Sequence, residues 1–138
     1  MKVLIDTNVI LDVLTGRKPH VDASADFLRL CGTHIAGFIT ASQTTDIFCL
    51  LRRGGKSISE TKSFIRKLTD NIRVMDVTAS DVKNALESGM DDYEDALLAF
   101  NGERHKAQFI VTRNEKDFDE SPIPAITPQM FMAQLYSG

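Results

Sequence analysis

Short apolar runs alternate along this chain with longer segments whose apolar residues recur at helical spacing. The first run is Val3-Leu4-Ile5, which is too short for a helix and β-branched at both ends, so it predicts a buried strand. Apolar residues between positions 9 and 14 then follow at helical spacing, which predicts a helix. Asp6 therefore stands at the carboxyl end of a strand, where open α/β sheets form their ligand crevices.

The same alternation continues to the end of the sequence. Further strands are predicted at 34–39, 72–77, 108–112 and 125–126. Helices are predicted over 23–31, from about 40 to 54, over 59–68 and 80–87, from about 93 to 105, and from Pro128 onward. Strands that alternate with helices indicate a mostly parallel sheet covered by helices on both faces. We expect one α/β domain over residues 1–138, because this length suits a single core.

Two helices carry more detailed predictions. Thr40 and Gln43 have the spacing of a capping box, which predicts that a helix begins directly after the second strand. In the segment 80–87, Val82 and Leu86 are expected to face inward because they lie four residues apart.

Composition narrows the class of protein. Apolar residues make up 43% and charged residues 25% of the chain, as in ordinary globular proteins. No apolar run approaches the roughly 20 residues that span a bilayer, and the N-terminus reads as a strand, so we expect a cytoplasmic protein with no membrane partner. Cys31 and Cys49 lie in apolar helical contexts and are expected to be buried thiols. The net charge of −3 argues against a broad basic surface for nucleic acid, but a metal-binding nuclease remains open because a bound metal inverts the local field.

Acidic side chains cluster around the predicted strand ends. Asp6 follows the first strand, Asp46 lies in the helix after the second, and Asp92 and Asp95 begin the helix before the fourth strand, which Asp117 follows. The carboxyl ends of parallel strands meet at one edge of a sheet, so these acids are expected to converge. Three of them also have an ordinary explanation: Asp6 and Asp92 as helix caps, and Asp46 as a residue that faces water.

Several carboxylates in one crevice either raise their pKa values or bind a hard cation. Mg²⁺ and Mn²⁺ prefer oxygen ligands and can activate water for phosphodiester hydrolysis. The sequence has no zinc-type His and Cys spacing and no glycine-rich phosphate loop. A phosphatase with Asp6 as nucleophile is disfavoured, because it predicts a second acid two residues on and Thr7-Asn8 offers none.

Four stretches resemble one known family. They are residues 3–12 (VLIDTNVILD), Ile39-Thr40-Ala41-Ser42 leading to Asp46-Ile47, residues 92–97 (DYEDAL), and residues 110–114 (IVTRN) with Lys116-Asp117-Phe118. In this order they resemble the PIN-domain family, most closely the VapC-like toxin ribonucleases of toxin–antitoxin systems. The resemblance spans nearly the whole chain.

The resemblance implies a three-layer α/β/α sandwich around a central, mostly parallel five-stranded sheet. It implies metal-dependent cleavage of RNA at an acidic site for Mg²⁺ or Mn²⁺, a cognate antitoxin as partner, and a homodimer. Carried over by position, the catalytic and metal-binding residues are Asp6, Asp46, Asp95 and Asp117. The supporting residues are Thr7, Asn8, Asp92, Thr112 and Asn114.

Two positions depart from the family pattern. Asp46 stands where the family usually has Glu, and Asn114 stands where it often has Asp. We expect Asp117 to supply the charge missing at Asn114. These departures keep a second hypothesis open, in which the chain is a PIN-fold module that binds RNA or protein without cutting.

Other charged residues are expected to lie outside the site. Asp12 is expected at the surface, and Asp76 and Asp81 are expected to face solvent or to cap a helix. Arg113, in a loop, is expected either to be solvated or to meet a phosphate.

Overall fold

Five parallel strands form the centre of the molecule. The computed structural model describes residues 1–137, and its strands lie in the order β3-β2-β1-β4-β5. They are β1 (Lys2–Ile5), β2 (Ala36–Thr40), β3 (Arg73–Met75), β4 (Phe109–Val111) and β5 (Ala125–Ile126). Leu4 on β1 pairs with Phe38 on one side and Ile110 on the other. The first, second and fourth strands are therefore central neighbours, and their carboxyl ends meet at one edge.

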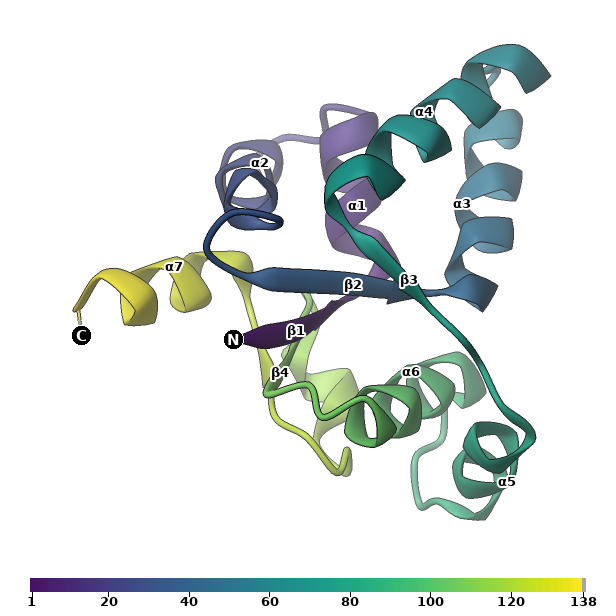
Figure 1. Ribbon diagram of the computed structural model, residues 1–138, viewed down its shortest axis with the longest axis vertical. Helices are drawn as coiled ribbons and strands as arrows, with labels where there is room; N and C mark the ends of the chain where they lie inside the picture. Colours follow the sequence, from purple (N-terminus) through teal and green to yellow (C-terminus); the bar gives the residue numbers. More distant parts are fainter. Residues whose placement is uncertain (138) are drawn as a thin grey trace.

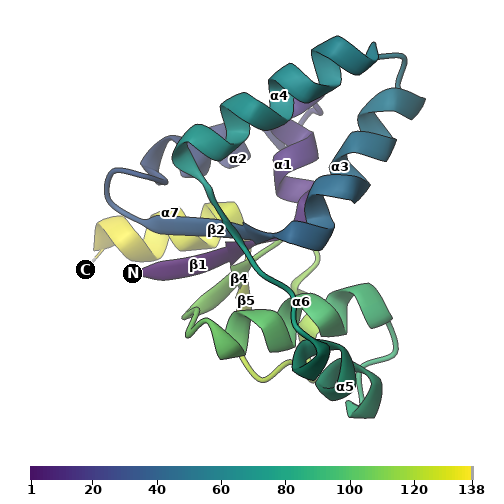
Figure 2. The ribbon, with the colours of Figure 1, turned by 45° about the vertical axis from the view of Figure 1, so that its right-hand side comes forward.

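Helices cover both faces of this sheet (Figures 1 and 2). One face carries α1 (Thr7–Leu14), α2 (Val21–Leu30), α3 (Ala41–Arg53), α4 (Ile58–Asn71) and α7 (Pro128–Ser137). The other carries α5 (Ala79–Glu87), α6 (Tyr93–Arg104) and the short 3₁₀ helix η1 (Glu115–Phe118). The predicted three-layer α/β/α architecture is confirmed. Within the described residues, no helix combines the length and apolar character that crossing a bilayer requires.

Two cores lie on opposite faces of the sheet. Along β1, Val3 and Ile5 belong to the core under α1, α2, α3 and α7, whereas Leu4 belongs to the core under α6. In β2, Ile39 belongs to the core under α1, α2, α3 and α7, and Phe38 belongs to the core under α6. Burial on both faces explains why the strands appear in the sequence as continuous apolar runs.

Capping boxes set the starts of three helices. Thr40 and Gln43 form the predicted capping box at α3. The pairs Ser57–Glu60 and Thr78–Asp81 do the same at α4 and α5. Each box satisfies backbone N–H groups that would otherwise lack a partner at the helix end.

The orientation predicted for α5 is wrong. Leu86 is 69% exposed and Val82 is only partly buried, whereas Asp81 and Ala85 form the buried face. The helix is turned because Asp81 points inward to an ion pair with Arg104 of α6. Apolar spacing alone could not predict this, since the partner lies in another helix.

The burial predicted for one cysteine is also wrong. Cys31 is buried as expected, but Cys49 is exposed. The buried residues of α3 include Ile47 and Leu51, which lie one turn apart, and Cys49 falls between them on the other side of the helix.

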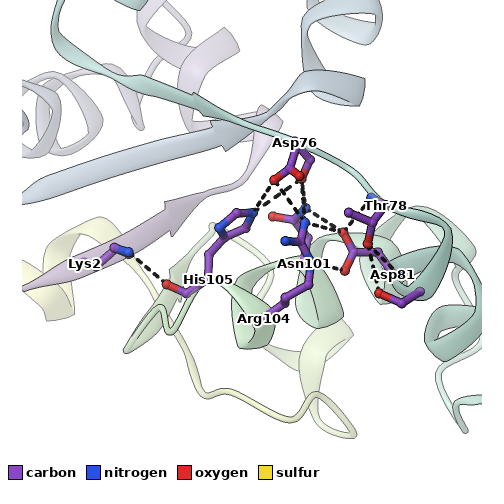
Figure 3. Close-up of polar contacts among 8 residues, drawn as sticks. Lys2, Asp76, Thr78, Asp81, Asn101, Arg104 and His105 are labelled. Carbon is purple, nitrogen blue, oxygen red and sulfur yellow. Dashed lines mark hydrogen bonds and ion pairs between the residues drawn. The ribbon is translucent and has the colours of Figure 1, made fainter.

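A polar network joins the end of β3 to α5 and α6 (Figure 3). Asp81 is 1% exposed; its Oδ1 accepts a hydrogen bond from Arg104 Nε at 2.8 Å and its Oδ2 accepts one from Asn101 Nδ2 at 2.9 Å. Asp76 is 66% exposed and pairs with Arg104 and with His105. Asp81 therefore caps its helix as predicted, but it is also a buried anchor between two helices.

The charge of Asp81 is stabilised in this network. Burial alone would raise the pKa of Asp81, but hydrogen bonds from Arg104, from the Thr78 backbone and from Asn101 outweigh burial and lower the pKa below its ordinary value. The network therefore fixes α5 against α6, the helix that carries Asp95 at its other end.

Candidate functional site

Asp6 lies where β1 ends and α1 begins. It occupies the N-cap position of α1, yet its Oδ2 accepts hydrogen bonds from Thr112 Oγ1 at 2.8 Å and from Asn8 Nδ2 at 3.4 Å. Burial raises the pKa of Asp6, hydrogen bonds from Thr112 and from the backbone of Thr7 and Asn8 act against this rise, and repulsion from Asp117 adds to it. Asp6 is thus a partly buried carboxylate that Thr112, directly after β4, and Asn8 of α1 hold in one orientation.

Thr112 is the centre of the hydrogen bonds around Asp6. Its buried hydroxyl donates to Asp6 and accepts from Asn8 Nδ2 at 3.3 Å and from the Asn114 backbone N–H at 3.1 Å. Asn8 Oδ1 accepts from the Arg113 backbone N–H at 3.3 Å. The structure therefore brings Asn8, Thr112 and the Asn114 backbone together with Asp6.

Gln43 joins the end of β1 to the end of β2. Its Oε1 accepts from the Thr40 N–H at 2.7 Å, and its Nε2 donates to the Ile5 carbonyl at 2.8 Å and to Thr7 Oγ1 at 3.1 Å. Thr7 thus contacts Gln43 through its hydroxyl. The capping-box spacing predicted only the first of these contacts, because the others depend on the neighbouring strand.

The first turn of α6 brings further acids to the same edge. Asp92 caps the helix, since its Oδ1 accepts from the Asp95 N–H at 3.0 Å. Burial, followed by repulsion from Asp92, Asp6, Asp117 and Glu94, raises the pKa of Asp95 from its ordinary 3.8 to about 7.

Glu94 is a member of this acidic group that the sequence analysis missed. Repulsion from Asp46, followed by burial and repulsion from Asp92 and Asp6, raises the pKa of Glu94. The negative charges of β1, α3 and α6 therefore act on one another, as the convergence of strand ends predicts. The signal that could have found Glu94 is its place in the first turn of the helix, beside Asp95.

Asp95 lies between two cavities. The smaller, of about 320 Å³, lies toward α3 and is lined by Asp6, Thr7, Ser42, Gln43, Thr45, Asp46, Leu50, Tyr93, Glu94, Asp95, Leu97 and Leu98. The larger, of about 440 Å³, lies toward η1 and is lined by Gly89, Met90, Asp91, Asp92, Asp95, Lys116, Asp117, Asp119 and Glu120. The four acids predicted as catalytic all line one cavity or the other. Asn114 lines neither, and its backbone N–H donates to Thr112.

The chemistry of these donors fits a hard divalent cation. All the acids offer carboxylate oxygens, and the raised pKa values of Asp6 and Asp95 show that negative charge is unfavourable there without a counter-charge. Within residues 1–137, no three His, Cys, Asp or Glu side chains are close enough to hold one ion. Mg²⁺ does not require such a cage, because it commonly binds through one or two carboxylates together with water and phosphate.

A buried ion pair lies beside this site, where Asp12 was expected at the surface and Arg113 was expected either to be solvated or to meet a phosphate. Asp12 is 1% exposed, and its Oδ2 lies 2.7 Å from Nε of Arg113. Arg113 directly follows Thr112 in the chain. The expected surface position of Asp12 is wrong, and Arg113 is partnered by Asp12 and only 21% exposed. The available signal was that Asp12 is the only charged residue of α1 and stands among apolar neighbours.

Comparison with known proteins agrees with this architecture. The family model described as "PIN domain" matches residues 2–116. No curated protein matches the chain.

Solved structures with the same fold come from toxin–antitoxin systems. VapBC2 from Rickettsia felis, bound to a DNA fragment from its promoter, has a TM-score of 0.73 at 17% identity and covers 92% of this chain and 98% of its own. VapBC-1 from nontypeable Haemophilus influenzae has a TM-score of 0.70 at 14% identity, with 94% and 99% covered. Mycobacterium tuberculosis VapC20, described as a sarcin–ricin loop cleaving toxin, has a TM-score of 0.64 at 16% identity, with 88% and 98% covered.

At these identities the structural likeness establishes the fold, and the family follows from the sequence match over most of the chain. The parallel sheet, the acids at its carboxyl edge and the match over residues 2–116 agree with one another. This chain belongs to the PIN-domain family.

Proposed function

We propose that this protein is a metal-dependent endoribonuclease, and that it is the toxin of a toxin–antitoxin pair. The observation that carries this proposal is the convergence of Asp6, Asp46, Asp95 and Asp117, from four separate elements, on the two cavities at the carboxyl edge of the sheet. The structural similarity supports it, because VapC20 is described as a sarcin–ricin loop cleaving toxin and another similar structure is a toxin–antitoxin complex from Klebsiella pneumoniae.

The four acids would have different roles in binding Mg²⁺ or Mn²⁺. Asp6 and Asp95 are the principal ligands, since their pKa values are raised and their charge is therefore unfavourable without a cation. Asp46 carries one methylene fewer than Glu, so it fits a contact through water. Asp117 brings from η1 the negative charge that Asn114 lacks.

The metal would activate a water molecule and neutralise charge on the scissile phosphate. Thr112 and Asn8 fix Asp6 through their hydrogen bonds, so its carboxylate does not have to be ordered during the reaction. Water adds to phosphorus, the bond to the leaving oxygen breaks, and that oxygen gains a proton. No covalent intermediate with the protein is formed.

The acidic edge also suits a protein inhibitor. An antitoxin that places a basic side chain beside Asp6 and Asp95 would replace the cation and relieve the same repulsion. We also expect the protein to form a homodimer, as the kinship suggests.

A second candidate function is a PIN-fold module that binds RNA or protein without cutting. It is favoured by Asn114, which offers no charge, and by the absence, over residues 1–137, of a compact three-ligand group.

The deciding experiment is cleavage of a labelled RNA pool with Mg²⁺, with Mn²⁺ and with a chelator. We compare the wild type with Asp6→Asn, and use Asp22→Asn, an exposed acid at the start of α2, as the charge-matched control. We expect metal-dependent cuts that Asp22→Asn retains and Asp6→Asn loses, by more than the roughly 10- to 100-fold that loss of an outer-shell partner costs a metal site.

The opposite result is equally clear. If the wild type is as inert as Asp6→Asn with both metals, and calorimetry detects no metal binding, the nuclease proposal is wrong. RNA binding without cleavage would then support the module.

A further inference from the structure

The two cavities beside Asp95 are both acidic, but their walls differ. The cavity toward η1 is lined by six carboxylates, those of Asp91, Asp92, Asp95, Asp117, Asp119 and Glu120, against the single cation of Lys116. RNA carries a negative charge at every phosphate, so a strand that continued across this surface would be repelled.

The cavity toward α3 has apolar walls beside its acids. Leu50 of α3 and Tyr93 of α6 stand on it, 41% and 42% exposed, together with Leu97 and Leu98. Exposed aromatic and apolar faces are the usual platforms for unpaired bases, because every base has a stacking face. Asp6, Asp46, Glu94 and Asp95 make this cavity acidic as well, but it offers a base an aromatic wall that the η1 cavity lacks.

One face of α3 leads away from this cavity to a cation. Asp46 and Leu50 line the cavity, and Arg53 follows on the same face of the helix at the i, i+4, i+7 spacing. At a rise of 1.5 Å per residue, Arg53 stands about 10 Å along α3 from Asp46. Arg53 is exposed, and within residues 1–137 it makes no ion pair.

The surroundings of Arg53 are positive. From residue 47 to residue 69 the chain has one acid, Glu60, and six cations: Arg52, Arg53, Lys56, Lys62, Arg66 and Lys67. Glu60 is occupied in the capping box of α4. A protein of net charge −3 thus separates its charges, with excess acid at η1 and excess base where α3 meets α4.

We propose that the RNA strand leaves the acidic site along α3, with a base against Tyr93 and Leu50 and a backbone phosphate at Arg53. This inference rests on the proposed function and adds a direction for the bound strand. It makes Tyr93 and Arg53 substrate-binding residues.

The test measures binding of a labelled, unstructured RNA oligonucleotide in Mg²⁺. All proteins carry Asp6→Asn, so binding is separated from cleavage. Arg53→Gln is compared with Arg66→Gln, which removes the same charge from an exposed position on α4. We expect Arg53→Gln to weaken binding several-fold and to lower the slope of log affinity against log salt by about 0.7, the value for one phosphate contact on a single strand. Arg66→Gln should change both quantities much less.

Tyr93→Ala tests the base contact separately. It should weaken binding by roughly tenfold without changing the salt slope, because stacking releases no counterions. Tyr93→Phe should restore the affinity, since it keeps the stacking ring.

Two results would overturn the proposal. Equal losses from Arg53→Gln and Arg66→Gln would mean that RNA responds only to the overall charge. Unchanged affinity and slope in Arg53→Gln would exclude the path along α3. All the variants in this binding test carry Asp6→Asn and do not cleave, so neither result decides the outcome of the nuclease experiment.

Discussion

At the scale of single residues, the acids of the candidate site are placed where their charge destabilises the fold. Asp95 is the clearest case, because burial and four neighbouring acids raise its pKa to about 7. A folded state that holds a proton more tightly than the unfolded state loses stability as pH rises from the unfolded pKa to the folded pKa. Such a group is expected where function, rather than stability, decides the residue.

Asp95→Asn should therefore stabilise the protein while abolishing metal-dependent cleavage. A shift from 3.8 to about 7 would correspond to several kcal/mol in a fully buried group, but Asp95 is partly exposed, so we expect about 1–2 kcal/mol at pH above about 7. Urea unfolding in chelator measures this gain.

The gain should shrink as pH falls and disappear well below 3.8, the ordinary pKa of Asp, where the Asp95 carboxyl is protonated in both folded and unfolded protein. Asp22→Asn is the control and should change little. A loss of stability in Asp95→Asn above about pH 7 would contradict the raised pKa.

Much of the candidate site was predictable at this scale, and the contacts that were not predicted share one cause. The positions of Asp6, Asp46, Asp95 and Asp117 at strand ends and helix starts follow from local pattern. The involvement of Glu94 and the second contact of Gln43 depend on the distance between separate elements, which local pattern does not contain.

At the scale of elements, strands and helix starts were predictable and the pairs between elements were not. Apolar runs locate β1 and β4, and the Thr40–Gln43 spacing locates the start of α3. The Asp12–Arg113 ion pair joins α1 to the loop after β4, and its residues lie near opposite ends of the chain. Periodicity treats each element alone, so it placed Asp12 at the surface.

The two halves of that ion pair should respond differently to mutation. Arg113→Met leaves the fully buried Asp12 without its counter-charge and should cost about 3–5 kcal/mol. Asp12→Leu should cost less, because Arg113 is partly exposed and can turn toward water. Urea unfolding of the two variants measures the difference.

The double variant Asp12→Leu with Arg113→Met should recover most of the loss, since an apolar pair replaces the ion pair. Arg29→Met breaks the exposed pair with Asp26 and should cost at most about 1 kcal/mol. Equal losses from Arg113→Met and Arg29→Met would show that Asp12 is hydrated in solution.

At the scale of the whole molecule, two groups of carboxyls act on stability in opposite directions. Asp81 has a lowered pKa, so its contribution is present above its ordinary value of 3.8 and is lost as pH falls. Asp6, Glu94 and Asp95 have raised pKa values, so stability falls as pH rises, up to about 7 for Asp95.

The wild type in chelator should therefore be most stable between about pH 4 and 5, with a Tm that falls on both sides. Mg²⁺ or Mn²⁺ should raise the Tm on the alkaline side, because the ion binds the folded state alone. At an ion concentration of 100 times the Kd, the gain in the free energy of unfolding is about 2.7 kcal/mol. Thermal unfolding followed by circular dichroism across this range checks both effects. A Tm that rises steadily from about pH 5 to 8 in chelator would contradict the first.

The overall architecture was predictable because alternating strands and helices allow few parallel arrangements. The separation of charge between η1 and the α3–α4 junction was not predictable. It depends on the folded arrangement, in which the acids of α6 and η1 lie on one side of Asp95 and the face of α3 lies on the other.

Gln43 illustrates how a neighbour can decide the identity of a residue. A helix judged alone would accept Glu at this position, because either side chain completes a capping box with Thr40. A carboxylate has no proton to give to the Ile5 carbonyl, and it would add a negative charge beside Asp6 and Asp46. A redesign that scored each helix separately would treat this exchange as harmless, although it would remove the link between the two strands from which the acidic edge is built.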